Sequence, residues 1–144
     1  GWDAARVERL RPVLRDALAA RGVPDAELGA AVERALAALR RAIGDERGRW
    51  VLGPHPESAT ELRITTAVEG AIVRLAVDRV FRDAAGERWI VDYKTSGHEG
   101  GDPEGFLDRE RERYGAQLRR YARALGGPAR LGLYFPLLAG WREV

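Results

Sequence analysis

The chain has 144 residues, of which 45% are hydrophobic and 32% are charged, and its formal net charge is +2. This length suits one domain, and no apolar run approaches the roughly eighteen residues needed to cross a bilayer. The absence of cysteine excludes disulfides, thiolate zinc sites and iron–sulfur clusters. We therefore expect a single domain without a membrane span, located in the cytoplasm. Methionine is absent even from the first position, so we also expect a fragment of a longer protein.

Helical spacing of apolar residues predicts two helices within residues 1–49, separated by the sequence RGVPD, with a kink or a helix start at Pro12. Neither helix carries residues suited to chemistry, and we expect this segment to pack on a core formed by residues 50–144. Runs rich in β-branched and aromatic residues then predict three strands, at 61–66, 70–81 and 88–94. A glycine-rich loop leads to a helix at 106–125, and RLGLYFPLL at 130–138 reads as a last strand. The predicted order is ααβββαβ, which belongs to the α/β (α+β) class.

The turn between the second and third strands sets how they pair. The three-residue loop AAG at 84–86 suits a type I turn closed by a left-handed glycine. Counting back along both strands from this loop places Phe81 opposite Trp89 and Asp78 opposite Asp92. We therefore expect two carboxylates to face each other across the ladder.

Lys94 is the only lysine in a chain with 23 arginines. Strand alternation places it on the same face as Asp78 and Asp92. Facing carboxylates destabilise a sheet unless a cation lies between them, and this oxygen-donor pair suits Mg²⁺ or Mn²⁺. A metal beside an ammonium group favours phosphodiester hydrolysis. The alternative is an ordinary surface salt bridge, because Asp-x-Lys is common by chance.

Three segments resemble, in order, the motifs of RecB-like nucleases of the PD-(D/E)XK superfamily: VDRVF, RWIVDYKTS and YGAQLRRYA. The resemblance covers roughly residues 61–144 and implies a restriction-endonuclease-like core, in which helices flank a mixed central β-sheet. The tail RLGLYFPLLAGWREV is similar to the C-terminal end of UvrD-type helicase–nuclease fusions, akin to the exonuclease V beta subunit and AddA.

The resemblance implies a role for each matching residue. Asp78, Asp92 and the carbonyl of Tyr93 would bind the metal. Lys94 would position the attacking water and stabilise the pentacovalent transition state. Small departures accompany these matches, since Ala76 stands where the family commonly has glycine.

The helix at 106–125 would complete the site. Gln117 and Tyr121, one turn apart, match the Q-x-x-x-Y pair that supports the site and contacts DNA. Tyr121 also fits the apolar stripe of the helix, so core packing is its alternative role. A neighbouring side carries three arginines that suit either phosphate contact or a solvated surface, Arg109, Arg113 and Arg120.

Other polar residues are less well determined. Glu61 precedes the first strand, where related nucleases often have an acidic residue, and its membership in the site stays open. His55 and His98 lie in loops, and we expect no chemical role for them. The family usually has a metal-binding histidine on an upstream helix, but residues 1–49 contain none. Either it lies in upstream sequence or this protein lacks it, so the isolated fragment is expected to bind metal weakly and to cut poorly or not at all.

These observations lead to three functional hypotheses. The first is a Mg²⁺- or Mn²⁺-dependent deoxyribonuclease, an exonuclease at the end of an ATP-dependent helicase that acts in double-strand-break repair and recombination. Its partners would be DNA, the upstream helicase region of the same chain and a second helicase–nuclease subunit. The second is a catalytically weak module for DNA binding or subunit docking, which the missing histidine favours. The third is a stand-alone restriction-type endonuclease, which the helicase-like tail disfavours.

Overall fold

The computed structural model describes residues 2–98 and 100–144, apart from the side chain of Val68. The chain divides into two compact units, Gly1–Leu52 and Gly53–Val144. Within the described ranges, no helix is long and apolar enough to cross a membrane. The expectation that the N-terminal segment packs on the core of a single domain stays a prediction.

The first unit is entirely helical. Its elements are α1 (Ala4–Glu8), α2 (Arg11–Ala20), α3 (Asp25–Gly44) and α4 (Glu46–Leu52). The first predicted helix is therefore two helices, because Pro12 occupies the first turn of α2 and sets a new helix start. Val7, Val32 and Leu36 form the core of this unit. α4 was not predicted, since seven residues give too short a periodic signal.

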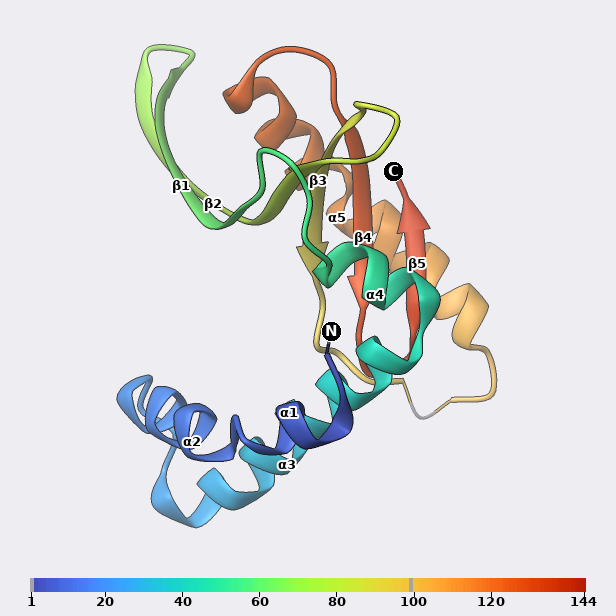
Figure 1. Cartoon of the computed structure of the whole chain (residues 1–144). Helices are drawn as coiled ribbons and strands as arrows, with labels where there is room; N and C mark the ends of the chain where they lie inside the picture. Colours follow the sequence, from blue (N-terminus) through green and yellow to red (C-terminus); the bar gives the residue numbers. More distant parts are fainter. Residues whose placement is uncertain (1, 99) are drawn as a thin grey trace. The chain divides into compact units, whose positions relative to one another are not determined.

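The second unit is built around a five-stranded mixed sheet in the order β1-β2-β3-β4-β5 (Figure 1). The strands are β1 (Ala59–Val68), β2 (Ala71–Arg82), β3 (Arg88–Tyr93), β4 (Arg130–Phe135) and β5 (Gly140–Glu143). Only β3 and β4 pair in parallel; the other neighbours are antiparallel. The helix that connects β3 to β4 is α5 (Pro103–Leu125), which passes behind the strands in Figure 1. The predicted α/β class with a mixed sheet and flanking helices is confirmed.

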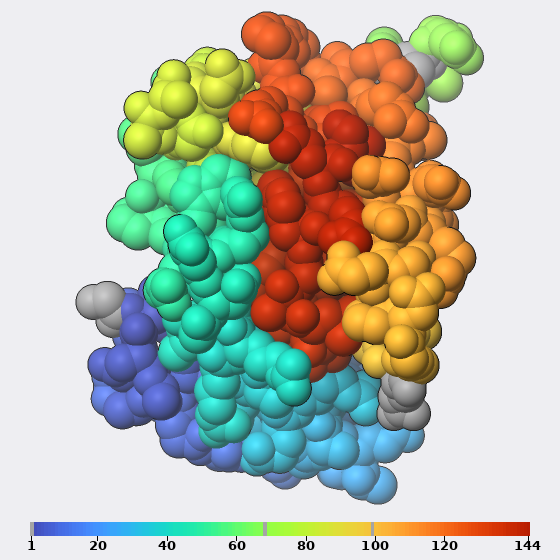
Figure 2. All heavy atoms as spheres, turned by 90° about the vertical axis from the view of Figure 1, so that its right-hand side faces the viewer, coloured from blue at the N-terminus to red at the C-terminus, as the bar shows by residue number. Residues whose placement is uncertain are grey.

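The core of this unit lies between the sheet and α5. Apolar side chains of β2, β3 and β4 meet one stripe of the helix, among them Val80, Ile90, Leu133 and Leu118. Figure 2 shows α5, in orange, side by side with the C-terminal strands, in red. β3 and β4 bury consecutive residues, as central strands do. α5 is thereby held against the ends of the strands that carry the predicted site residues.

The C-terminal end differs from its prediction. β4 ends at Phe135 rather than continuing to residue 138, because Pro136 cannot donate a ladder hydrogen bond. A turn follows, and β5 pairs back on β4, with Gly132 opposite Glu143. A Cβ at Gly132 would lie 2.0 Å from the Trp141 ring, so glycine is required for β5 to pack there.

Candidate active site

The hairpin between β2 and β3 has the predicted turn. Gly86 has φ 82°, and the Asp83 amide donates to the Glu87 carbonyl at 3.0 Å. The register follows from this turn, with Phe81 opposite Trp89. Sequence counting therefore placed these strands correctly.

The prediction that Asp78 directly opposes Asp92 in the ladder needs correction. The ladder between the two strands ends at the pair Arg79 and Val91. At the next position the Asp78 side chain replaces backbone pairing, because its Oδ2 accepts a hydrogen bond of 2.9 Å from the Tyr93 amide. β2 thus leaves β3 at Asp78, and a fork opens between the strands. The Asp78 and Asp92 carboxylates still lie close enough to interact directly.

Electrostatics at the fork disfavour two ionised carboxylates. Burial raises the pKa of Asp78 to about 6, and the Asp92 carboxylate adds to the rise. The Tyr93 amide and the Lys94 ammonium act in the opposite direction on this pKa. Asp92 is itself only 5% exposed. The fork therefore concentrates negative charge where water is largely excluded.

Lys94 is the cation that compensates this charge. Its Nζ lies 2.5 Å from Asp92 Oδ2, and its side chain is 18% exposed. The Lys94 amide donates to the Tyr134 carbonyl at 2.9 Å, which fixes the backbone against β4. On its other side, Nζ lies 3.8 Å from the centroid of the Tyr114 ring. An ammonium held between a carboxylate and an aromatic face has a defined position.

α5 brings the remaining predicted pair to the site. Gln117 Nε2 donates to the Tyr121 hydroxyl at 2.6 Å. Burial raises the pKa of Tyr121, with Asp92 as the next cause, so this residue lies within the field of the carboxylates. Its 6% exposure also makes it part of the core, as its place on the apolar stripe predicted.

Comparison with known proteins gives this geometry a family. The model of the PD-(D/E)XK nuclease superfamily matches residues 3–135. The chain belongs to the PD-(D/E)XK nuclease superfamily. No curated protein matches the chain at a significant level. Membership in this superfamily indicates hydrolysis of nucleic-acid phosphodiesters, and it implies nucleic-acid binding.

PD-(D/E)XK nucleases usually use divalent metal ions, and the donors at the fork fit one. Asp92 Oδ2 is buried, and in the described part of the chain no group gives it a directed hydrogen bond; its contact with Lys94 is an ion pair. Two adjacent carboxylates are what Mg²⁺ commonly takes from a protein, the rest of its shell being water and phosphate. Residues 2–98 and 100–144 gather no group of three or more His, Cys, Asp or Glu side chains at one point.

The other predicted candidates lie around the site or away from it. Glu61 is level with Asp78 in the register of β1 and β2 and has φ 50°. His55 stacks on Phe81 with ring centroids 4.2 Å apart. His98 stacks on Phe106 at 4.7 Å.

The three arginines of α5 that were predicted to contact phosphate are all exposed. Arg113 is placed most specifically, because its Cζ lies 5.2 Å from the centroid of the Tyr114 ring. It also lies 3.7 Å from Glu110. The set as a whole, Arg109, Arg113 and Arg120, stays a predicted phosphate contact.

Sequence reasoning assigned Tyr114 to the core stripe and missed its contact with Lys94. The available signal was its position, one helical turn before Gln117 on the same side of α5. It also missed Glu110, a carboxylate with 8% exposure on this stripe. An acidic residue on a buried stripe was the available signal.

Proposed function

We propose that this chain is the nuclease domain of a DNA helicase–nuclease and that it hydrolyses DNA phosphodiester bonds with Mg²⁺ or Mn²⁺. The main observation behind this proposal is the fork, where Asp78, Asp92 and Lys94 come together from two strands. The proposal makes Gln117 and Tyr121 supports of this site, next to the carboxylates.

Each residue then has a chemical role. Asp78, Asp92 and the Tyr93 carbonyl would hold the metal, which when bound supplies an acidified water and positive charge for the phosphoryl oxygens. Lys94 holds a compact ammonium at the same place, where it orients the water and stabilises the extra negative charge of the pentacovalent phosphorus. A guanidinium is broader and has a fixed fork of donors, so arginine would not place its charge equivalently.

The wider context rests on sequence motifs. The order of VDRVF, DYKTS and YGAQLRRYA, followed by the tail at 130–144, supports a RecB-like exonuclease joined to a UvrD-type, ATP-binding helicase. Such an enzyme would act in the cytoplasm on DNA ends during double-strand-break repair and recombination, with a second helicase–nuclease subunit. A P-loop and a helical histidine in upstream sequence are the expected features of the parent protein.

A second candidate is a catalytically weak module that binds DNA or docks a subunit. The specific observation in its favour is that the segment before β1 contains no histidine except His55, which stacks on Phe81. Under this alternative the fork would still bind a metal and DNA, but turnover would be absent.

The test incubates the chain with single-stranded DNA, duplex DNA and RNA in Mg²⁺ or Mn²⁺. Asp92→Ala and Lys94→Ala are expected to abolish cleavage, and Lys94→Arg should restore little of it. Asp16→Ala, which removes an exposed carboxylate of α2, is the matched control and should cleave normally. Equal degradation by wild type and the site variants contradicts catalysis at the fork. DNA binding without cleavage by the parent protein favours the second candidate.

End-labelled and circular DNA then define the mode of cleavage. An exonuclease shortens linear strands from one end and leaves circular single strands intact. Cleavage of the circles would contradict the exonuclease proposal while keeping the nuclease proposal.

A further inference from the structure

The outer part of the β1–β2 hairpin has one face in solvent. In this part, side chains alternate between exposed and partly buried positions along both strands. The partly buried side chains belong to the core below α5, as Leu62, Ile64 and Leu75 show. The register places six exposed residues together on the other face: Arg63, Thr65, Ala67, Ile72, Arg74 and Ala76. In Figure 1 this hairpin, in green, reaches away from β3, β4 and β5.

The solvent face carries two arginines that are not paired with acids among the described residues. Arg63 and Arg74 make no hydrogen bond or ion pair with any residue that the structure describes. None of the six residues on the face is acidic, and the nearest carboxylate towards the tip is that of Glu69 in the turn. The two arginines border a groove of about 390 Å³, which is also lined by Ile64, Thr65, Leu75 and Ala76. Some other arginines of this unit do pair with acids, as Arg130 does with Glu143.

The solvent face ends close to the fork along the chain. Asp78 comes two residues after Ala76 and four after Arg74 in β2. A strand rises about 3.3 Å per residue, so Arg63, opposite Ala76, lies about 7 Å along the strand from Asp78. Arg74 lies about 13 Å away by the same measure. These distances suit groups that lie beyond the scissile phosphate on a continuous strand.

We propose that this face binds the phosphodiester backbone of the nucleic-acid substrate on one side of the cleavage point. The inference rests on the proposed function, because it extends the strand held at the fork. A guanidinium group can donate two parallel hydrogen bonds to the oxygens of one phosphate. The Thr65 hydroxyl adds a further donor beside the two arginines. Such contacts fix the path of a strand without reading its bases. The ligand of this face is thus identified as a nucleic-acid backbone by its negative charge and by the closeness of the face to the fork.

The test compares the wild-type chain with the double variant Arg63→Gln, Arg74→Gln. The control is Arg111→Gln, Arg119→Gln on α5, which removes equal charge beside Glu112 and Glu143. Affinity for a fluorescein-labelled single-stranded oligonucleotide is measured by anisotropy in Ca²⁺ over a salt series. The hairpin variant is expected to bind about tenfold more weakly. Its salt slope should fall by about 1.4, at about 0.7 per lost phosphate contact on a single strand.

Two further measurements separate binding from the chemistry of the fork. Hydrolysis of bis(p-nitrophenyl) phosphate, which is too small to reach the hairpin, should be unchanged in the hairpin variant. Arg63→Lys with Arg74→Lys should restore most of the affinity, because it restores the charge.

Several results overturn the inference. The first is an unchanged affinity and salt slope in the hairpin variant. That result is expected if the face instead docks an acidic protein segment. An equal loss in the α5 control also overturns it, since any positive charge would then suffice. Loss of small-diester hydrolysis places the defect in the fork. If the parent protein also hydrolyses neither substrate, the proposed function fails, while the affinity and the salt slope still decide the role of the hairpin.

Discussion

Replacing Asp78 by asparagine should stabilise the metal-free protein at alkaline pH. The folded protein binds the proton of Asp78 more tightly than the unfolded chain, because its pKa rises from the ordinary 3.8 to about 6. The stabilisation from protonated Asp78 is therefore full below about pH 4 and is lost as pH rises through about 6. At pH 8 the wild-type site holds an ionised Asp78 at a cost that asparagine avoids. Asparagine retains an oxygen for the Tyr93 amide.

The magnitude follows from the two pKa values. The difference between about 6 and 3.8 corresponds to about 3 kcal/mol, at 1.4 kcal/mol per pKa unit. Asp78 is half-buried, and solvent screening reduces the difference in the free energy of unfolding to about 1–1.5 kcal/mol. For a chain of this size the variant should melt about 3–6 °C higher.

The assay is thermal unfolding in EDTA at pH 8 and at pH 4.5. Asp78→Asn should melt higher than wild type at pH 8 and at nearly the same temperature at pH 4.5, and it should not cleave DNA. Asp16→Asn on α2 is the control and should match wild type at both pH values. A melting temperature of Asp78→Asn at or below that of wild type at pH 8 would refute the argument that the fork stores unfavourable charge.

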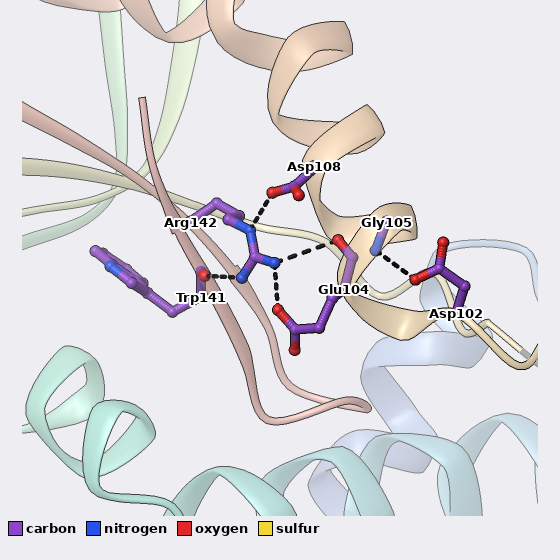
Figure 3. Close-up of polar contacts among 6 residues, drawn as sticks. All are labelled: Asp102, Glu104, Gly105, Asp108, Trp141 and Arg142. Carbon is purple, nitrogen blue, oxygen red and sulfur yellow. Dashed lines mark hydrogen bonds and ion pairs between the residues drawn. The ribbon is translucent and has the colours of Figure 1, made fainter.

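Three further predictions concern contacts around the site. Tyr114→Leu should lower kcat about fivefold with little change in KM, since the Lys94 ammonium loses a contact of about 1 kcal/mol, whereas Tyr114→Phe should retain the rate. Arg142→Ala should lower the free energy of unfolding by about 1–3 kcal/mol in denaturant titration, because its bonds to Asp108 and Glu104 join β5 to the start of α5 (Figure 3); an unchanged midpoint would contradict this. Gly132→Ala should cost about 1–3 kcal/mol in the same titration, through collision with Trp141, and a neutral effect would show that β5 packs elsewhere.

The sequence was most informative where structure is local. A three-residue loop with glycine at its left-handed position determines both the turn and the register, so the pairing of Phe81 with Trp89 could be counted directly. The apolar stripe of α5 similarly predicted Leu118 and Tyr121 in the core. These features depend on near neighbours in the chain.

Other features depend on contacts between distant segments. The ladder ends at Arg79 because the Asp78 side chain captures an amide of β3, and no pattern within β2 indicates where two strands separate. The contact of Tyr114 with Lys94 depends on how the loop after β3 places α5. β5 was missed because four residues are too few to show alternation, although Gly132 is a sign of close packing by an aromatic ring.

Because Asp78 accepts a hydrogen bond from the Tyr93 amide, its side chain has a structural role as well as a place in the candidate site. One oxygen of the carboxylate closes the end of a ladder, and the other remains for the fork. Glutamate at this position would keep the charge but add a methylene, so it could not satisfy the amide and the fork at the same strand separation. A change that looks conservative by charge is therefore disruptive by length. Position 78 therefore requires a side chain of a particular reach as well as an acidic group.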